Sequence, residues 1–392
     1  MMSIDSLLTP EQRELRATVR AFARKEVGPR AAAIDSEQHD WHDLFLRMGE
    51  LGLLGLLLPE EWGQGADMVS QALVQEELAY VSGSIANSQV GAIEEGLFIS
   101  LHGSEDLKVR YLPDIATGKL KASFALTEPQ AGSDASNLKT TAKRTDSGSY
   151  VINGRKAWVT AGATADVIIV VAMTDDASGT RVPTAFLVET GWPGVQAGRP
   201  EDNHGVRGLG TSGMSFDDVE VPAANILGAP GQGLDLSLAT INLGRISTAA
   251  MSVGLGQRAF DAALAYSLQR EQFGKPIFKF QGIKFQLAQM ATKLDAARLL
   301  YVHAARERDS GALGLARVAS EAKFFAADAG VWVCEQAMLI FGANGYTREN
   351  PVERCLRDAR VCQIFEGTSN VQQIVIAREL ASEFKNAAAN LT

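Results

Sequence analysis

Residues 283–301, IKFQLAQMATKLDAARLLY, carry the signal that decides the fold. Apolar or small side chains recur there in steps of four, three, four, three and four, at Ile283, Leu287, Met290, Leu294, Ala297 and Tyr301. This spacing places them on one face of an α-helix, which turns once in about 3.6 residues. A long helix with one apolar face must bury that face against other helices, so the stretch predicts an antiparallel helical bundle.

The whole chain divides into three parts. Residues 1–118 have helical patterns and begin at Thr9-Pro10-Glu11-Gln12, where Thr9 caps a helix and Gln12 completes a capping box. Residues 119–230 contain short apolar runs typical of strands. Helical patterns return after residue 230. We therefore expect an α+β, mainly α fold with an N-terminal helical domain (1–118), a central antiparallel β-barrel or sandwich domain (119–230) and a C-terminal helical bundle (231–392).

The central part contains an Asn-Gly pair that is typical of a β-hairpin. Tyr150-Val151-Ile152 precedes Asn153-Gly154, and Lys156-Ala157-Trp158-Val159 follows it. Both turn residues tolerate a positive φ, so the sequence predicts a hairpin turn at this point. Trp158 has two interpretations, a core residue or an aromatic wall beside a flat cofactor, and its local sequence does not decide between them.

Composition excludes several classes of protein. The 392 residues include 37 Lys and Arg against 46 Asp and Glu, a net charge of −9, which argues against nucleic-acid binding. The three cysteines, Cys334, Cys355 and Cys362, are too few for a disulfide scaffold and predict buried reduced thiols. No leucine-rich stretch is long enough for membrane insertion, and the acidic N-terminus is unlike a targeting signal. We expect a soluble cytoplasmic protein without a metal site.

Three other stretches have both a structural and a chemical interpretation. Residues 126–134 form a surface turn or a backbone that a ligand can approach. Residues 270–277 break a helix, either as a plain loop or to present Arg270 to a phosphate. Glu366 is either an acid near a helix start or a base whose pKa is raised by apolar neighbours, Ile364 and Phe365.

Together, five stretches follow the order and spacing of one enzyme family, and the chain resembles the acyl-CoA dehydrogenases along nearly its full length. The stretches are 126–134 (LTEPQAGSD), 153–160 (NGRKAWVT), 270–276 (REQFGKP), 341–346 (FGANGY) and 357–370 (RDARVCQIFEGTSN). The resemblance implies an α-helical domain, a β domain and a C-terminal four-helix bundle. It also implies a homotetramer with FAD between the β domain and the bundle.

The resemblance assigns the FAD contacts to two groups of residues. Leu126, Thr127, Ser133, Trp158, Thr160, Thr368 and Asn370 match residues that line the flavin cofactor of their own chain. Arg270, Phe273, Gln281, Leu339, Phe341, Gly342 and Ala343 match residues that contact the FAD of a neighbouring subunit.

The resemblance also implies the reaction and its residues. Family members remove an α proton from an acyl-CoA, transfer a hydride from the β carbon to the flavin and release a trans-2-enoyl-CoA. They pass the electrons to an electron-transfer flavoprotein, as in fatty-acid β-oxidation. Glu366 matches the family base, and its backbone N–H polarises the thioester carbonyl. The substrate contacts are expected from Ser133, Asn242, Arg245 and Gly367.

Some positions depart from the family pattern. Leu339 stands where many relatives have Gln, Ala343 replaces a common Gly, and Asn242 replaces a common Asp. Isovaleryl-type enzymes place their base at Gly244, which leaves Glu366 as the candidate here. Glutaryl-type enzymes need an Arg between residues 81 and 107, where this chain has no Arg or Lys, so we expect no dicarboxylate substrate. The Glu94-Glu95 pair in that segment is expected on a solvated helix face.

Two other functions share this fold. Flavin oxidases pass their electrons to oxygen, but acyl-CoA oxidases are typically longer than 392 residues and nitroalkane oxidases use Asp as the base. DNA-associated flavoproteins of the alkylation response carry a basic C-terminal extension, whereas Arg378 and Lys385 are the only bases after Asn370. The sequence therefore favours an acyl-CoA dehydrogenase that binds no nucleic acid.

Overall fold

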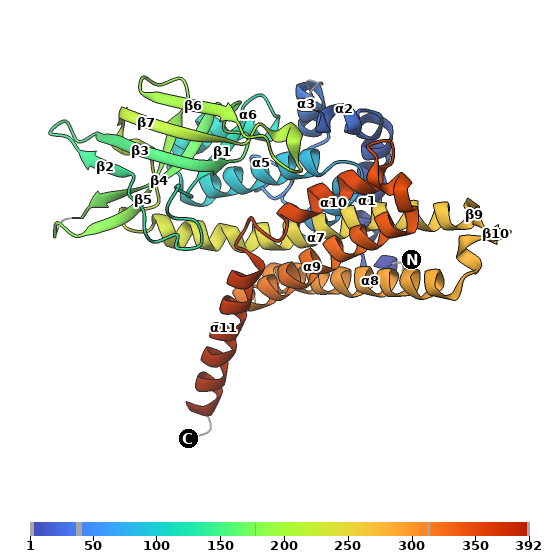
Figure 1. The fold of residues 1–392 in the computed structure, drawn as a ribbon. Helices are drawn as coiled ribbons and strands as arrows, with labels where there is room; N and C mark the ends of the chain where they lie inside the picture. The colour runs from blue at the N-terminus through green and yellow to red at the C-terminus, as the bar shows by residue number, and fades with distance from the viewer. Residues whose placement is uncertain (1–3, 37–40, 177, 312–313, 390–392) are drawn as a thin grey trace.

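A computed structural model describes residues 4–36, 41–176, 178–311 and 314–389. Helices cover one side of a central sheet and continue into a long bundle (Figure 1). The main helices are α1 (Pro10–Phe22), α2 (Ala31–Asp35), α3 (His42–Glu50), α4 (Met68–Ala79), α5 (Gly83–His102), α6 (Glu105–Ala116), α7 (Gly233–Gln269), α8 (Gln281–Asp309), α9 (Leu315–Phe341), α10 (Pro351–Val361) and α11 (Ser369–Ala389). Short 3-10 or π segments are η1 (Ile4–Leu7), η2 (Ala23–Val27), η3 (Gly28–Arg30), η4 (Arg207–Leu209), η5 (Ala223–Asn225), η6 (Ile277–Lys279) and η7 (Gly342–Tyr346).

The N-terminal helices begin where polar caps predict them. The capping box at Thr9 and Gln12 is present, with both reciprocal hydrogen bonds. Asp67 caps α4 and Ser82 caps α5, each by accepting from a backbone N–H three residues on. These caps fix where α5 starts, and α5 carries residues of the candidate site.

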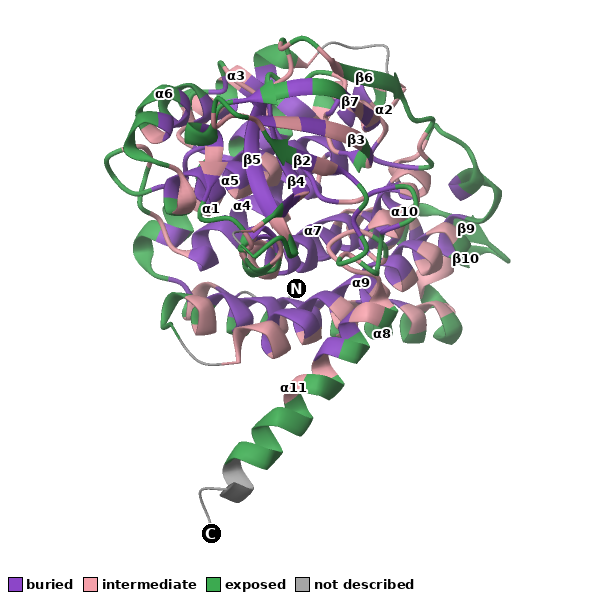
Figure 2. Ribbon diagram, turned by 90° about the vertical axis from the view of Figure 1, so that its left-hand side faces the viewer, coloured by how far each residue is buried: buried purple, intermediate pink, exposed green. Residues whose placement is uncertain are grey.

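The central sheet is mainly antiparallel, in the order β6-β7-β3-β2-β4-β5-β8, with β1 added in parallel to β4. Its strands are β1 (Ala122–Ala125), β2 (Thr141–Arg144), β3 (Tyr150–Val159), β4 (Val167–Asp175), β5 (Arg181–Glu189), β6 (Val195–Pro200), β7 (Ser212–Val221) and β8 (Ile226–Leu227). Both faces of β4 and β5 are largely buried, as the purple strands of Figure 2 show.

The predicted hairpin turn at Asn153-Gly154 is wrong. Strand β3 runs straight through these residues and pairs with β2 and β7. A register shift between Ile152 and Gly154 relieves the local geometry, and Asn153 exchanges two hydrogen bonds with Asp218 of β7. A bulge uses the same Asn-Gly preference for unusual φ as a turn does, which is why the pair misled the prediction.

The predicted bundle is confirmed. Of its apolar positions on α8, Leu287, Met290, Leu294, Ala297 and Tyr301 are buried. The predicted helix break is also present: α7 ends at Gln269, a two-residue hairpin of β9 (Glu271–Gln272) and β10 (Lys275–Pro276) follows, and α8 starts at Gln281. The three cysteines are buried free thiols, as expected.

Within the described part of the chain, one helical stretch, Leu315–Tyr346, is long and apolar enough to cross a membrane, but it is a core helix. It comprises α9 and η7, and α9 packs against α7, α8, α10 and α11. Helix α11 instead extends away from the body (Figure 1), and Ile374, Leu380 and Phe384 on it are exposed.

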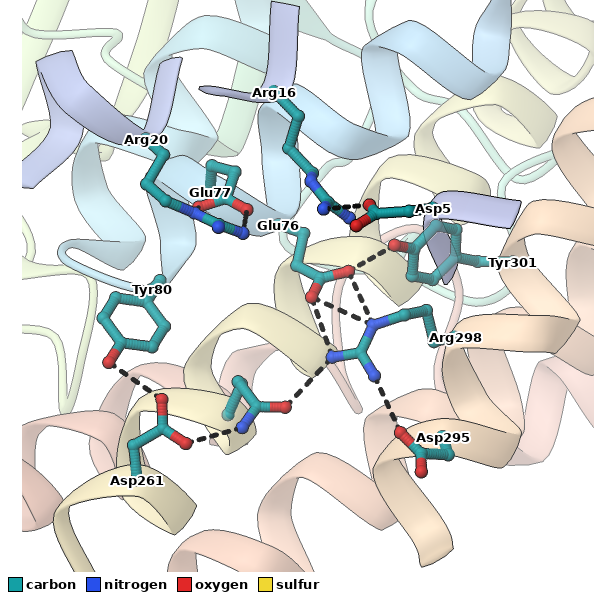
Figure 3. Close-up of polar contacts among 11 residues, drawn as sticks. Asp5, Arg16, Arg20, Glu76, Glu77, Tyr80, Asp261, Asp295, Arg298 and Tyr301 are labelled. Carbon is teal, nitrogen blue, oxygen red and sulfur yellow. Dashed lines mark hydrogen bonds and ion pairs between the residues drawn. The ribbon is translucent and has the colours of Figure 1, made fainter. Parts of the chain in front are cut away.

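A buried polar network ties the N-terminal helices to the bundle (Figure 3). The guanidinium of Arg298 on α8 donates to both carboxylate oxygens of Glu76 on α4, and Tyr301 donates to the same carboxylate. Arg298 also donates to Gln257 of α7 at 3.0 Å. Burial alone would raise the pKa of Glu76, but Arg298 and Tyr301 hold it below its ordinary value.

Removing Arg298 should destabilise the fold strongly. Arg298→Ala leaves Glu76 charged and buried without its partner, which typically costs about 3–5 kcal/mol. Arg110→Ala is the control, because its bridge to Glu189 is solvent-exposed and such bridges contribute at most about 1 kcal/mol. Denaturant unfolding of both variants is the measurement. Equal losses of stability would show that the network does not couple the domains.

Candidate active site

Glu366 lies in the turn between α10 and α11, with an unusual backbone conformation. Its φ is 54° and that of Gly367 is 88°, so two consecutive residues have left-handed backbones. A positive φ is uncommon for a residue other than glycine and persists only where the surroundings impose it.

Three buried side chains hold this turn by its carbonyl groups. Lys323 of α9 donates to the Gly367 carbonyl at 2.6 Å. Gln372 of α11 donates to the carbonyls of both Glu366 and Gly367 at 2.9 Å. Arg245 of α7 donates to the Glu366 carbonyl at 3.3 Å. Three helices thereby fix the orientation of one side chain, the carboxyl of Glu366.

The carboxyl of Glu366 is buried against α7. A Cβ atom added to Gly244 would lie only 2.9 Å from its Oε2 atom, so a larger residue at 244 would have to displace this carboxyl. Oε2 has no hydrogen-bond partner. The residue as a whole is half-buried. Glu366 lies three residues before the start of α11, so the choice between an acid near a helix start and a base stays a prediction.

The surroundings shift the proton affinity of Glu366 toward neutrality. Burial raises the pKa of its carboxyl to about 7, while the positive charges of Arg245 and Lys323 limit the rise. A carboxyl with a pKa near the working pH is suited to accept a proton from a weak carbon acid and to release it again.

Two more carboxyl groups lie beside Glu366, contrary to the expected solvated helix face. Glu95 is 5% exposed, and Glu94 Oε1 is buried without a partner. Burial raises the pKa of both well above the ordinary value, and the charge of Glu366 adds to the shift. The sequence alone did not show this, because α5 is apolar on most of its surface and buries both sides.

Two of the predicted FAD-binding stretches lie side by side in the central sheet. Ala157 donates its backbone N–H to Thr127 at 3.0 Å, and the buried Nζ of Lys156 donates to the Leu126 carbonyl at 2.9 Å. The same Nζ lies 2.8 Å from Glu128, whose carboxylate accepts from the backbone at Lys139 and Thr140. This buried pair fixes the loop that follows β1.

Trp158 is not a core residue. It is 62% exposed and has a φ of 59°, so the end of β3 turns its indole outward. Thr160 next to it lines a small cavity together with Glu95 of α5. An outward aromatic ring and a fixed loop are suited to contact a flat cofactor, and Thr160 brings this end of β3 beside Glu95. These residues fit the FAD that the resemblance implies.

The other predicted site residues are placed as follows. Ser133 and Asn370 are exposed, and Thr368 caps α11 by accepting from the Val371 N–H at 3.3 Å. Asn242 accepts from Arg245 at 2.8 Å, so both belong to the support of the Glu366 turn. A contact of Arg245 or Ser133 with CoA stays a prediction.

The second group of predicted FAD contacts lies far from Glu366. Arg270, Phe273, Gln281, Leu339, Gly342 and Ala343 are exposed around the far end of α7 and the ends of α8 and α9. Phe341 is buried there and stacks on Tyr266 at 4.2 Å. Gly244 and the end of α7 at Gln269 are about 38 Å apart, at about 1.5 Å per helical residue. The structure does not bring the two groups together within one chain.

Sequence reasoning missed Lys323 and Gln372. Lys323 is the single positive charge in the mainly apolar segment AKFFAADAG, and a Lys in such a helix indicates a buried polar contact. Gln372 carries no comparable signal, because an amide one turn into a helix looks like ordinary surface. Among the described residues, no cluster of His, Cys, Asp or Glu is suited to hold a metal.

Comparison with known proteins gives one family for all three parts. The N-terminal, middle and C-terminal domains of acyl-CoA dehydrogenases match residues 9–119, 123–219 and 231–381. An acyl-CoA dehydrogenase of Bacillus subtilis (strain 168) is 40% identical over 95% of this chain and 98% of its own.

Two solved structures share this fold and act on different substrates. The butyryl-CoA dehydrogenase of Megasphaera elsdenii is 37% identical, covers 95% of this chain and 99% of its own, and gives a TM-score of 0.91. A glutaryl-coenzyme A dehydrogenase in complex with glutaryl-CoA is 36% identical, covers 96% of each chain and gives 0.92. Similarity to these structures therefore does not identify the acyl group that this chain accepts. That inference has to come from the residues of its own site.

The buried carboxyl of Glu366 should reduce the stability of the fold at high pH. Its folded pKa of about 7 exceeds the ordinary 4.5, so the folded state binds the proton more tightly and loses stability as pH rises from about 4.5 to 7. Glu366→Gln removes this loss and should stabilise the protein by about 1–3 kcal/mol at pH 8.

Denaturant unfolding at two pH values checks this. The gain should shrink as pH is lowered toward 5, where wild-type Glu366 is already protonated in the folded state. A gain of equal size at both values would mean that burial does not shift this carboxyl.

Proposed function

The chain belongs to the acyl-CoA dehydrogenase family, and we propose that it oxidises an acyl-CoA thioester to the trans-2-enoyl-CoA with FAD. The observation that carries the proposal is the unpartnered carboxyl of Glu366, fixed on its turn with a pKa near 7. When bound, FAD would accept a hydride from the β carbon. Glu366 would accept the α proton on its carboxylate.

The α proton of a thioester is weakly acidic, so its removal needs both a placed base and a polarised carbonyl. Lys323, Gln372 and Arg245 donate hydrogen bonds to the backbone carbonyls of the turn. The protein, rather than solvent, therefore fixes the orientation of these peptide groups. We propose that the Glu366 N–H then donates to the thioester oxygen, an interaction typically worth a few kcal/mol in the transition state. Burial of the site excludes water from the base.

A monocarboxylic acyl group fits this site better than a dicarboxylic one. Helix α5 supplies Glu94 and Glu95 to the region and no Arg or Lys. A second carboxylate on the substrate would be buried beside these two acids without a cation from α5, which is costly. Glutaryl-CoA is therefore expected to be a poor substrate.

The rival function is a flavin oxidase, and oxygen distinguishes it from a dehydrogenase. Anaerobic mixing with a short acyl-CoA should bleach the flavin, and admitting air should then reoxidise it only slowly. Adding an electron-transfer flavoprotein should restore the oxidised spectrum rapidly. Rapid reoxidation by oxygen alone, with formation of hydrogen peroxide, would favour the oxidase. Failure of every acyl-CoA to bleach the flavin would contradict the proposed function.

We further propose a homotetramer in which one subunit contributes to the FAD site of another. The separation of about 38 Å between Gly244 and the end of α7 supports this, because no side chain spans it. The exposed Phe273 and Leu339 at that end, 92% and 69% exposed, and the extended helix α11 offer apolar surface for a second copy. A cytoplasmic location and a role in fatty-acid β-oxidation belong to the same proposal, with the free buried thiols in its favour.

Replacing Arg270 should weaken both cofactor binding and assembly. Arg270→Ala removes a charge-assisted bond to an FAD phosphate, about 1.5–3 kcal/mol, so the purified variant should carry little FAD and dissociate more readily. Arg144→Ala on β2, which is also exposed, is the control. Absorbance at the flavin band and sedimentation measure the two effects. A fully yellow, tetrameric Arg270→Ala protein would rule out the intersubunit contact.

A further inference from the structure

The proposed reaction uses one of three buried carboxyl groups and leaves two without a role. Oxygen atoms of Glu94, Glu95 and Glu366 are all buried without a hydrogen-bond partner. Buried polar atoms are nearly always partnered in native structures, so an orphaned acceptor points to a ligand or a chemical role. Glu366 has such a role as the base, and Glu94 and Glu95 do not.

Glu94 and Glu366 face the same point on α7. A Cβ atom on Gly244 would lie 2.5 Å from Glu94 Oε1 and 2.9 Å from Glu366 Oε2. The Glu94 carboxyl therefore lies beside the base and not at a remote end of the site. Glu95, the next residue of α5, lines the cavity shared with Thr160. Glu94 is thus placed beside the base, and Glu95 beside one predicted flavin contact, Thr160.

The nearby cations, Lys323 and Arg245, form their hydrogen bonds with other groups than Glu94 and Glu95. Lys323 and Arg245 donate to the Gly367 and Glu366 carbonyls, and Arg245 donates further to Asn242 and Ser320. Burial keeps the pKa of Glu94 well above its ordinary value, with Glu366 and Glu95 adding to the shift. The buried Oε1 of Glu94 can accept a hydrogen bond from a donor placed beside it.

We propose that Glu94 selects acyl groups that carry a hydrogen-bond donor, a hydroxyl or an amide N–H, within about two carbons of the carbons that react. The inference rests on the proposed function and names its substrate class. A plain alkyl chain would leave Glu94 buried and unpartnered, and a carboxylate tail would meet a second and a third acid. A donor-bearing acyl group satisfies the orphaned oxygen directly.

Matched acyl-CoA pairs test this with the flavin-loaded wild-type enzyme. In 4-hydroxybutyryl-CoA a hydroxyl replaces the terminal methyl of pentanoyl-CoA, and in the monoamide of glutaryl-CoA a carboxamide replaces the carboxylate. Anaerobic stopped-flow gives the rate of flavin reduction divided by the dissociation constant for each. Sites built to bond a polar group discriminate strongly against the analogue without it, so we expect at least about a 10-fold preference for the donor in both pairs.

Two variants locate the preference. Glu94→Met keeps the side-chain length without the acceptor and should reduce the hydroxyl-to-methyl ratio to about one or below. Glu94→Gln keeps an acceptor oxygen and should retain the preference for the hydroxyl within a few-fold. If Glu94→Met purifies without flavin, Glu94→Leu, which also lacks the acceptor, takes its place in the comparison.

Each outcome separates this inference from the function it rests on. If pentanoyl-CoA reduces the wild-type flavin as fast as 4-hydroxybutyryl-CoA, Glu94 selects no donor, although the dehydrogenase function stands. If the preference persists in Glu94→Met, another residue provides it and the assignment to Glu94 is wrong. If no acyl-CoA reduces the flavin, the proposed function fails and this inference fails with it.

Discussion

The site depends on one constraint, a buried carboxyl carried by a left-handed turn. Glu366 can face Gly244 only because its backbone adopts a φ of 54°, and Lys323, Gln372 and Arg245 impose that conformation through the carbonyls of the turn. These donors come from α9, α11 and α7, so the orientation of the Glu366 side chain depends on how these three helices pack together. Burial of the Glu366 carboxyl raises its pKa to about 7. The same burial lowers the stability of the folded protein above neutral pH.

The remaining architecture positions what must meet this carboxyl. Helix α5 brings Glu94 and Glu95 beside it, and the network around Arg298 holds α4 against α7 and α8. The central sheet supplies the fixed loop after β1, the outward ring of Trp158, and Thr160, which lines a cavity with Glu95. Such a clustering of orphaned carboxyl oxygens is unfavourable for folding, and proteins retain it at functional sites.

The sequence predicted the periodic and motif-bearing features and missed those that depend on packing. The spacing on α8, the capping box at Thr9 and the helix break after Gln269 are local, so one stretch of sequence suffices to read them. The turn at Asn153-Gly154 was wrong because strand partners, not the dipeptide, decide between a turn and a bulge. Glu94 was placed in solvent because its burial comes from α7 and the Glu366 turn, which are distant in sequence.

The most direct test of the account is anaerobic stopped-flow of the flavin-loaded Glu366→Gln variant with a saturating acyl-CoA. Gln nearly matches the shape of Glu but cannot accept the proton, so flavin content and acyl-CoA binding should persist. The rate of flavin reduction should fall by at least the roughly 10²–10⁴-fold typical of a placed general base. Reduction within a few-fold of the wild-type rate would show that Glu366 is not the base.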